Sequence, residues 1–110
     1  MKIVEIADIE PSPNPHGVDA RKIYDTKNAV AVHMIIKPGE SLKKHMTPVD
    51  VFFYVLEGEG IVEMGDEKKK VAQDMLIDSP ARMPHCWYND GEKDLRILIV
   101  KVPNPVKSAK

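Results

Sequence analysis

The sequence has one cysteine, few aromatic residues and no long apolar run. Because Cys86 stands alone, no disulfide can form within the chain, and this fits a reducing compartment. No stretch approaches the ~20 consecutive apolar residues that a membrane-spanning helix needs. The first residues include Glu5, Asp8 and Glu10, where a secretory signal would be apolar. We therefore expect a cytoplasmic protein with no membrane partner.

An excess of charge of one sign is also missing. The chain has 16 basic and 17 acidic residues, with both signs mixed along its length. A basic run at residues 68–70 follows Asp66 and Glu67, as expected for the solvated flank of a hairpin. A nucleic-acid-binding protein would show a basic excess or stripe, so we expect no nucleic-acid partner.

Helical periodicity with caps is absent from every window of ten or more residues. The apolar runs are instead short, rich in β-branched residues and bounded by proline and glycine, as strands are. Strands are predicted at residues 2–6, 21–24, 29–36, 51–56, 61–64, 69–72, 75–77, 85–88 and 95–102, with a hairpin around Gly65 and Asp66. Many short strands within 110 residues predict one all-β domain, a sandwich or a barrel.

Proline marks two segments outside these strands. Residues 11–17 contain three alternating prolines, and because proline lacks a backbone donor this stretch predicts an extended loop. Pro103 and Pro105 end the last strand, so we expect a flexible tail at about residues 104–110.

Two segments, each built around one histidine, offer candidates for chemistry. Residues 39–60 contain His45 and residues 74–89 contain His85. Both histidines lie beside strand-like sequence and turn signals, so an antiparallel sheet could bring them together. Since side chains alternate along a strand, residues 45 and 47 are predicted to share a face.

His45 and His85 are candidate metal ligands, because imidazole binds zinc, copper, iron and nickel. Two imidazoles make an incomplete site, since such metals take at least three protein ligands. Asp50 is the candidate third ligand. As the neighbour of Val51 it would need a twist or bulge to turn inward, and the alternative is a solvated carboxylate at a strand start.

Four further residues have simpler interpretations. His33 is predicted to be a surface or subunit-interface residue, and His16, in the proline loop, is assigned no role. Cys86 follows His85 directly, so it is predicted to point to the opposite face, as a buried, unreactive thiol rather than a nucleophile. Trp87 shares the His85 face and forms either the wall of a small-molecule pocket or part of the core.

The first histidine segment resembles a motif of the cupin family. That motif reads glycine, five residues, histidine, one residue, histidine, three or four residues, glutamate, six residues and glycine. Gly39, His45 and Gly58 match it. Thr47 stands where the second histidine belongs, and Val51 stands where the glutamate belongs.

The second segment resembles the other cupin motif, which reads glycine, five residues, proline, one residue, glycine, two residues, histidine, three residues and asparagine. Pro80, His85 and Asn89 match, whereas Asp74 and Arg82 replace the two glycines. The resemblance covers residues 39–89, about half the chain, in the right order and separation.

The resemblance implies an all-β, antiparallel jelly-roll β-barrel that forms a single cupin domain over residues 1–110. In cupins with a full site, two histidines and a glutamate of the first motif join one histidine of the second to hold a divalent metal. His45 and His85 remain here, so the resemblance supports the fold more than metal-dependent catalysis.

Three functions stay open. In the first, His45 and His85 hold iron, manganese, nickel, zinc or copper, and the metal acts on a substrate. In the second, a metal-free pocket lined by Val51, Phe53 and Trp87 binds a small molecule through the two histidines and Thr47. In the third, the histidines perform metal-free acid–base isomerisation or epimerisation.

Assembly into a homodimer is also expected. The runs at residues 29–36 and 95–102 contain more apolar side chains than one inward face needs; Ile35, for example, faces away from Met34 and Ile36. Subunit pairing would cover this excess.

Overall fold

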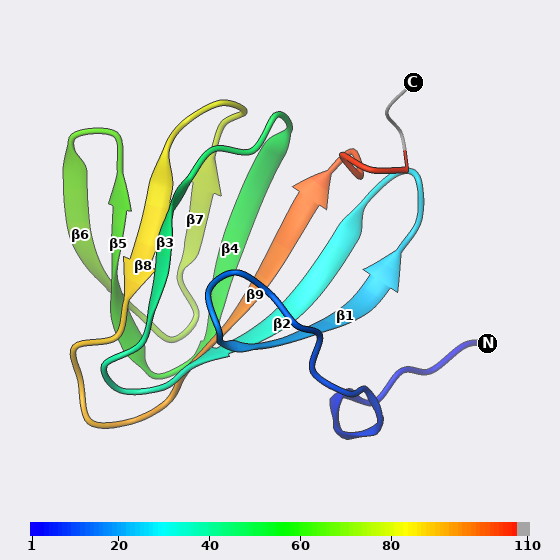
Figure 1. The fold of residues 1–110 in the computed structure, drawn as a ribbon, viewed down its shortest axis with the longest axis horizontal. Coiled ribbons are helices and arrows are strands. Elements are labelled where there is room, and N and C mark those ends of the chain that lie inside the picture. The colour runs from blue at the N-terminus through cyan, green and yellow to red at the C-terminus, as the bar shows by residue number, and fades with distance from the viewer. Residues whose placement is uncertain (108–110) are drawn as a thin grey trace.

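The computed structural model describes residues 1–107, whose strands form two antiparallel sheets that face each other across one apolar core (Figure 1). The strands are β1 (Asp19–Asp25), β2 (Val30–Ile36), β3 (Ser41–His45), β4 (Asp50–Glu57), β5 (Glu59–Met64), β6 (Glu67–Ala72), β7 (Leu76–Ser79), β8 (His85–Tyr88) and β9 (Leu95–Val102). The all-β jelly-roll prediction is confirmed, as a two-sheet sandwich rather than a barrel closed all the way round. Within residues 1–107, no helix is long and apolar enough to cross a membrane.

The order of the strands sets which residues face each other. The first sheet has the order β1-β2-β9-β4-β7, and the second has the order β3-β8-β5-β6. Thus β9 lies between β2 and β4, while β8 lies between β3 and β5. These two interior strands are fixed on both sides by backbone hydrogen bonds, so they hold inward-facing side chains rigidly.

Alternation along the strands fills the core. In β9, Leu95, Ile97 and Ile99 are buried, and the register places Ile99 opposite Phe53 of β4. Phe53 packs edge-on against Trp87 of β8, with ring centroids 5.3 Å apart. These apolar side chains hold the two sheets together, because burying each of them removes a large area from water.

The strand predicted at residues 2–6 does not form. Residues 1–5 have no regular structure, and η1 (Ile6–Asp8) is one short 3₁₀ turn. No strand of residues 1–107 pairs with this stretch. Its backbone N–H and C=O groups therefore have no neighbouring strand to bond with, although its apolar residues alternate as in a strand. By contrast, β3 was not predicted as a separate strand, since only Leu42 among its five residues is buried.

Two residues of the second cupin-like motif keep a backbone conformation that favours glycine. Asp74 has φ 68° and Arg82 has φ 65°, both in the left-handed region. These are the two positions where the motif has glycine. The backbone of this segment therefore follows the motif even where its side chains depart from it.

The two matching glycines of the first motif share a positive φ but differ in their surroundings. Gly39 and Gly58 both have φ +85°. A Cβ added at Gly39 would meet nothing within 4 Å, whereas one added at Gly58 would lie 2.5 Å from the Asp94 carbonyl oxygen. Gly58 is thus required both by its backbone angle and by a close approach of the chain before β9.

Asn89, the last residue of the second motif, closes the loop after β8. Its buried amide donates to the carbonyls of Ile36 and Lys93, each at 2.8 Å, and its Oδ1 accepts the Gly91 N–H at 3.0 Å. These bonds satisfy backbone groups that the strands leave unpaired. They fix the end of β8 against the end of β2.

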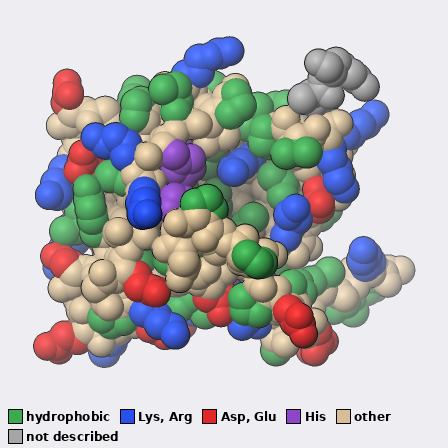
Figure 2. Space-filling view, viewed as in Figure 1, with side chains coloured by type: hydrophobic (Ala, Val, Ile, Leu, Met, Phe, Trp, Pro, Cys, Tyr) green, Lys and Arg blue, Asp and Glu red, His purple; other side chains and the backbone are tan. Residues whose placement is uncertain are grey.

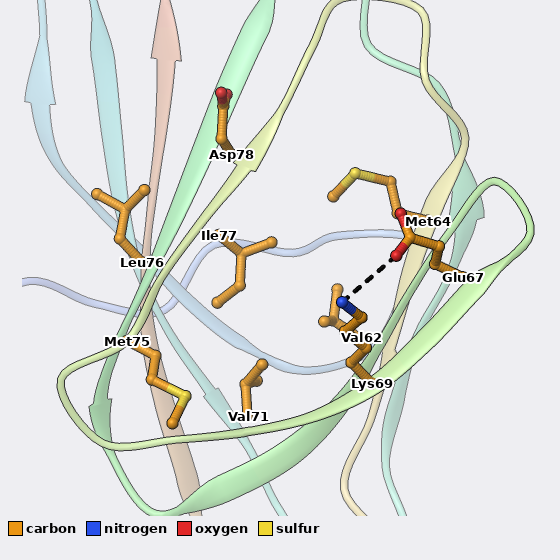
Figure 3. A pocket seen from close by; sticks show the side chains of 9 residues that line it. All are labelled: Val62, Met64, Glu67, Lys69, Val71, Met75, Leu76, Ile77 and Asp78. Carbon is orange, nitrogen blue, oxygen red and sulfur yellow. Dashed lines mark ion pairs between the residues drawn. The ribbon is translucent and has the colours of Figure 1, made fainter.

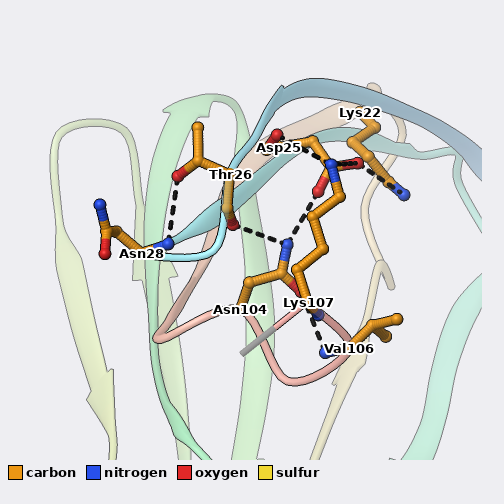
Figure 4. A network of polar contacts seen from close by, with 7 residues as sticks. All are labelled: Lys22, Asp25, Thr26, Asn28, Asn104, Val106 and Lys107. Atoms are coloured by element: carbon orange, nitrogen blue, oxygen red, sulfur yellow. Dashed lines mark hydrogen bonds and ion pairs between the residues drawn. The ribbon is translucent and has the colours of Figure 1, made fainter. Parts of the chain in front are cut away.

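Asn104 connects the end of the described chain to the end of β1 through hydrogen bonds (Figure 4). Its buried amide donates to Asp25 Oδ1 at 2.8 Å and to the Thr26 carbonyl at 2.9 Å, and Lys107 lies 3.4 Å from Asp25. Within the tail predicted to be flexible, Asn104 and Lys107 thus contact the end of β1 and the residue after it. The rest of that predicted tail, residues 108–110, lies outside the described residues.

Candidate functional site

His45 and His85 meet on neighbouring strands of the second sheet. The β3–β8 register pairs the two residues directly, and their ring centroids are 4.6 Å apart in an edge-to-face arrangement. Phe53 of the opposite sheet lies edge-on to the His85 ring, with centroids 5.2 Å apart. The predicted meeting of the two histidines is therefore found, and it occurs on the inner side of the sandwich.

Both histidines line a cavity of about 240 Å³ between the sheets. Most of its wall is apolar. The lining residues are Asn14, Pro15, His16, Ala20, Val32, Met34, Leu42, His45, Val51, Phe53, His85, Ile99 and Lys101. Figure 2 shows histidine side chains reaching the surface on this face, at the edge of a hollow and beside basic side chains. A mostly apolar cavity with a few converging polar groups is typical of small-molecule sites.

His16, assigned no role from the sequence, is a third histidine of this cavity. The loop before β1 carries it over the sheets, and its ring centroid lies 5.4 Å from that of His45. The backbone groups of Lys43 contact both rings. The Lys43 N–H donates to His16 Nδ1 at 3.0 Å, and His45 Nδ1 lies 3.2 Å from the Lys43 carbonyl oxygen.

These two hydrogen bonds determine where the protons of the neutral rings lie. A nitrogen that accepts from an N–H has no proton, so His16 carries its proton on Nε2. A nitrogen beside a carbonyl oxygen must donate, so His45 carries its proton on Nδ1 and keeps a lone pair on Nε2. The two neighbouring rings thus have opposite hydrogen-bonding character at Nε2.

His85 is held neutral by its surroundings. Its Nδ1 lies 3.0 Å from the Oγ of the buried Ser79. Burial, and then the charges of His45 and Lys101, lower the pKa of His85 from 6.5 to about 4, although a hydrogen bond with the Met83 backbone opposes this shift. At neutral pH, His85 is therefore an uncharged imidazole.

Lys101 is another polar residue of this cavity that was not assigned to a site from the sequence. It continues the inward series of β9 after Leu95, Ile97 and Ile99, and it lines the same cavity as the histidines. Burial, with a further contribution from the charge of Lys22, lowers the pKa of Lys101. The alternation of β9 contained the signal for Lys101, because a lysine in phase with buried residues points inward. No periodicity could have placed His16, since it lies in a loop.

The other predicted pocket residues divide into two groups. Val51 and Phe53 line the cavity, as expected. Thr47 and Trp87 are buried but lie outside its lining. Because β3 ends at His45, the strand alternation from which residues 45 and 47 are predicted to share a face stops before residue 47. Trp87 belongs to the apolar core.

Asp50 is directed away from the cavity. Its exposed carboxylate accepts the Ala81 N–H at 2.9 Å and so fixes the loop between β7 and β8. β4 has no bulge at its start that would turn this side chain inward, because Asp50 and Val51 pair in sequence with Val102 and Lys101. Asp50 therefore matches the alternative interpretation, a carboxylate at a strand start.

Two residues on the outer faces of the sheets have structural roles. His33 is 2% exposed and accepts a hydrogen bond from Arg96 Nε at 3.1 Å, so its prediction as a surface residue is wrong for the isolated chain. Cys86 points away from the cavity, as predicted, and is buried. Its thiol donates to the Tyr88 hydroxyl, which in turn donates to Glu63.

The donors around the cavity do not fit a resident divalent metal. Among residues 1–107, no group of three or more histidine, cysteine or acidic side chains lies close enough together to hold one. His45 and His85 each already use a ring nitrogen in a hydrogen bond, and the His16 Nε2 atom carries a proton. Lys101 adds positive charge to the same cavity. A stable site for these metals needs at least three protein ligands.

A larger pocket of about 480 Å³ lies at the open edge between β6 and β7 (Figure 3). Of its charged residues, Glu67 and Lys69 pair with each other at 3.4 Å and Asp78 is exposed, while the remainder is apolar, including Met64, Met75 and Leu76. Its lining contains no histidine. The cavity of His45 and His85 is therefore the better candidate for a specific site.

Comparison with known proteins adds a family and several similar structures. A family model described as "Cupin domain" matches residues 32–101. The chain is 29% identical over 103 residues to "Polyketide synthase CurC" of Streptomyces cyaneus, covering 88% of this chain and 66% of that protein. It spans between 49% and 66% of the length of the curated relatives it matches.

Two solved structures show the same fold. An RmlC-like cupin from Shewanella frigidimarina superposes with a TM-score of 0.86 at 15% identity, covering 99% of this chain and 96% of the other. The polyketide cyclase RemF from Streptomyces resistomycificus superposes with a TM-score of 0.84 at 23% identity, covering 96% of this chain and 82% of the other.

Proposed function

Since this chain belongs to the cupin domain family, we propose that its inner cavity binds a small organic molecule through His45 and His85, without a resident metal. The observation that carries this proposal is the arrangement of two hydrogen-bonding imidazoles in a cavity with a largely apolar wall. The cavity volume of about 240 Å³ suits a compact ligand, smaller than drug-sized compounds.

The names of two similar proteins support a choice of ligands for testing. One is named a polyketide synthase and the other a polyketide cyclase. We therefore propose polyketide-type fragments, such as small aromatic or β-dicarbonyl compounds, as the first ligands to screen. Phenols and the enol forms of β-dicarbonyl compounds combine apolar surface with hydroxyl groups that can donate to an imidazole lone pair.

Replacing His45 with phenylalanine tests the proposal directly. This change keeps a flat ring but removes both nitrogens, so we expect each ligand found in a thermal-shift screen to bind about tenfold more weakly, the value of one hydrogen bond. Asp50→Asn is the matched control, because Asp50 lies outside the cavity, and it should leave affinity unchanged. If the ligands bind equally to wild type and His45→Phe, the cavity is not their site.

Elemental analysis separates this proposal from the metal-dependent alternative. Protein purified without a nickel column is expected to contain far less than one iron, manganese, nickel, zinc or copper per chain, because the donor set is incomplete. Near-stoichiometric metal that disappears in His45→Phe would contradict a metal-free cavity. It would restore the hypothesis that His45 and His85 are ligands.

The lowered pKa of His85 bears on the acid–base alternative. A general base works best when its pKa lies near the operating pH. With a pKa of about 4, His85 is a weak base at neutral pH. The structure therefore supports a hydrogen-bonding role for His85 better than proton transfer by it.

We also propose that the chain forms a homodimer through the outer face of the first sheet. Ile35, Phe52, Leu98 and Val100 lie on that face and are only partly buried in the single chain. Light scattering at micromolar concentration is expected to give twice the chain mass of 12.4 kDa, and Leu98→Lys should shift this toward the monomer. A mass of 12.4 kDa for wild type would contradict the dimer.

A further inference from the structure

The ionisable side chains that line the cavity are all bases. In the part of the chain that the structure describes, its lining contains three histidines and one lysine but no aspartate or glutamate. Asn14, the remaining polar side chain, uses its amide for the Ser12 and Val18 carbonyls and its Oδ1 for the His16 N–H. The groups left for a ligand are therefore three imidazoles and the Lys101 ammonium.

Lys101 stands out because it is partly buried without a counter-ion. Among residues 1–107, no carboxylate lies within ion-pair distance of its Nζ, although seven other pairs form on the surface. The neighbouring charge that acts on it is the like charge of Lys22, which together with burial lowers its pKa. A buried charge without a partner costs free energy, and an anion in the cavity would offset that cost.

Lys101 and two of the histidines extend from opposite sheets of the sandwich. It extends from β9 of the first sheet, while His45 and His85 extend from β3 and β8 of the second. Apolar residues such as Val51 and Ile99 lie in the same lining. A ligand in this cavity can therefore place a charged end at Lys101, an apolar body along the wall and a polar group at the imidazoles.

We propose that the ligand of this cavity is a small organic acid whose carboxylate pairs with Lys101. The inference rests on the proposed function and adds to it the chemical class of the ligand. A carboxylate is favoured over a phosphate ester, because one ammonium balances a single negative charge and the lining of the small cavity contains no second lysine and no arginine. A cationic ligand is disfavoured by the charge of Lys101.

Matched acids and amides test the proposal. Acetate, lactate and benzoate would be titrated by calorimetry against acetamide, lactamide and benzamide, which have nearly the same shape without the charge. We expect at least one acid to bind at least tenfold more tightly than its amide. In Lys101→Met this preference should disappear, whereas Lys101→Arg, which keeps the charge, should retain it.

Lys44→Met is the matched control, because Lys44 pairs with Glu63 on the outer face of the second sheet and does not line the cavity. It should leave the preference intact. The Lys101→Met protein should melt at the same or a higher temperature than wild type, because it no longer buries an unpaired charge. A loss of binding in that variant is then not a loss of folding.

Several outcomes would overturn the inference. It is wrong if no acid binds more tightly than its amide, if Lys101→Met keeps the preference, or if inorganic phosphate binds more tightly than every acid. The proposed function fails separately: if His45→Phe leaves the binding of acids and amides unchanged, the cavity is not the ligand site. If His45→Phe weakens both while Lys101→Met weakens neither, the cavity binds ligands but does not select acids.

Discussion

Replacing Gly58 with alanine is expected to lower the free energy of unfolding by about 3 kcal/mol. The left-handed backbone at φ +85° costs an L-residue about 1–2 kcal/mol, and a new Cβ 2.5 Å from the Asp94 carbonyl oxygen adds an overpacking cost of similar size. The clash is with backbone, so no side-chain rotation can relieve it. The segment before β9 must move, although β9 is fixed between β2 and β4.

Gly39 provides the control for this prediction. It has the same φ of +85°, but an added Cβ would meet nothing within 4 Å. Gly39→Ala is therefore expected to cost only the strain of the left-handed backbone, about 1–2 kcal/mol. Urea denaturation followed by the fluorescence of the buried Trp87 measures both variants. Equal losses for the two variants would show that the approach of Asp94 to Gly58 does not constrain the fold.

The second large effect is a loss of stability on acidification that is due to His85. The pKa of this buried side chain is about 4, against an ordinary value of 6.5. Between these values the unfolded chain binds a proton that the folded chain does not, so stability falls as pH falls through this window. The contribution is complete above pH 6.5, is lost by about pH 4 and amounts to about 3 kcal/mol.

His85→Gln isolates this contribution from the carboxylates, which also titrate in acid. Glutamine can still hydrogen-bond with Ser79 but does not titrate in this range. The free energy of unfolding of both proteins would be measured by urea denaturation at intervals from pH 7 to pH 4. It should fall more steeply with decreasing pH in the wild type than in His85→Gln. Parallel curves would mean that the folded protein accepts a proton on His85 as easily as the unfolded chain does.

Much of the fold could be predicted because its signals are local. The β9 sequence alternates buried and half-buried residues, and the hairpin of β5 and β6 turns at Gly65 and Asp66, as expected. The strand expected at residues 2–6 failed for a non-local reason, since no neighbouring strand pairs with it. β3 was missed because it has one buried residue and is defined by its pairing with β8.

The site was harder to predict than the fold. The meeting of His45 and His85 could be anticipated from two spaced motifs in an antiparallel sheet. Thr47 was misplaced because a strand end, which depends on the pairing partner, interrupts the alternation. His16 enters the cavity through a loop whose path is set by long-range contacts, such as the hydrogen bond from the Lys43 N–H to its ring.

The hydrogen bonds of His16 and His45 with the Lys43 backbone give the two neighbouring rings opposite hydrogen-bonding character. One ring offers a proton at Nε2 and its neighbour offers a lone pair at the same atom. A hydroxyl group can both accept and donate, whereas a ketone oxygen can only accept. A hydroxyl group therefore has a hydrogen-bonding counterpart in both rings, and a ketone oxygen has one only in His16.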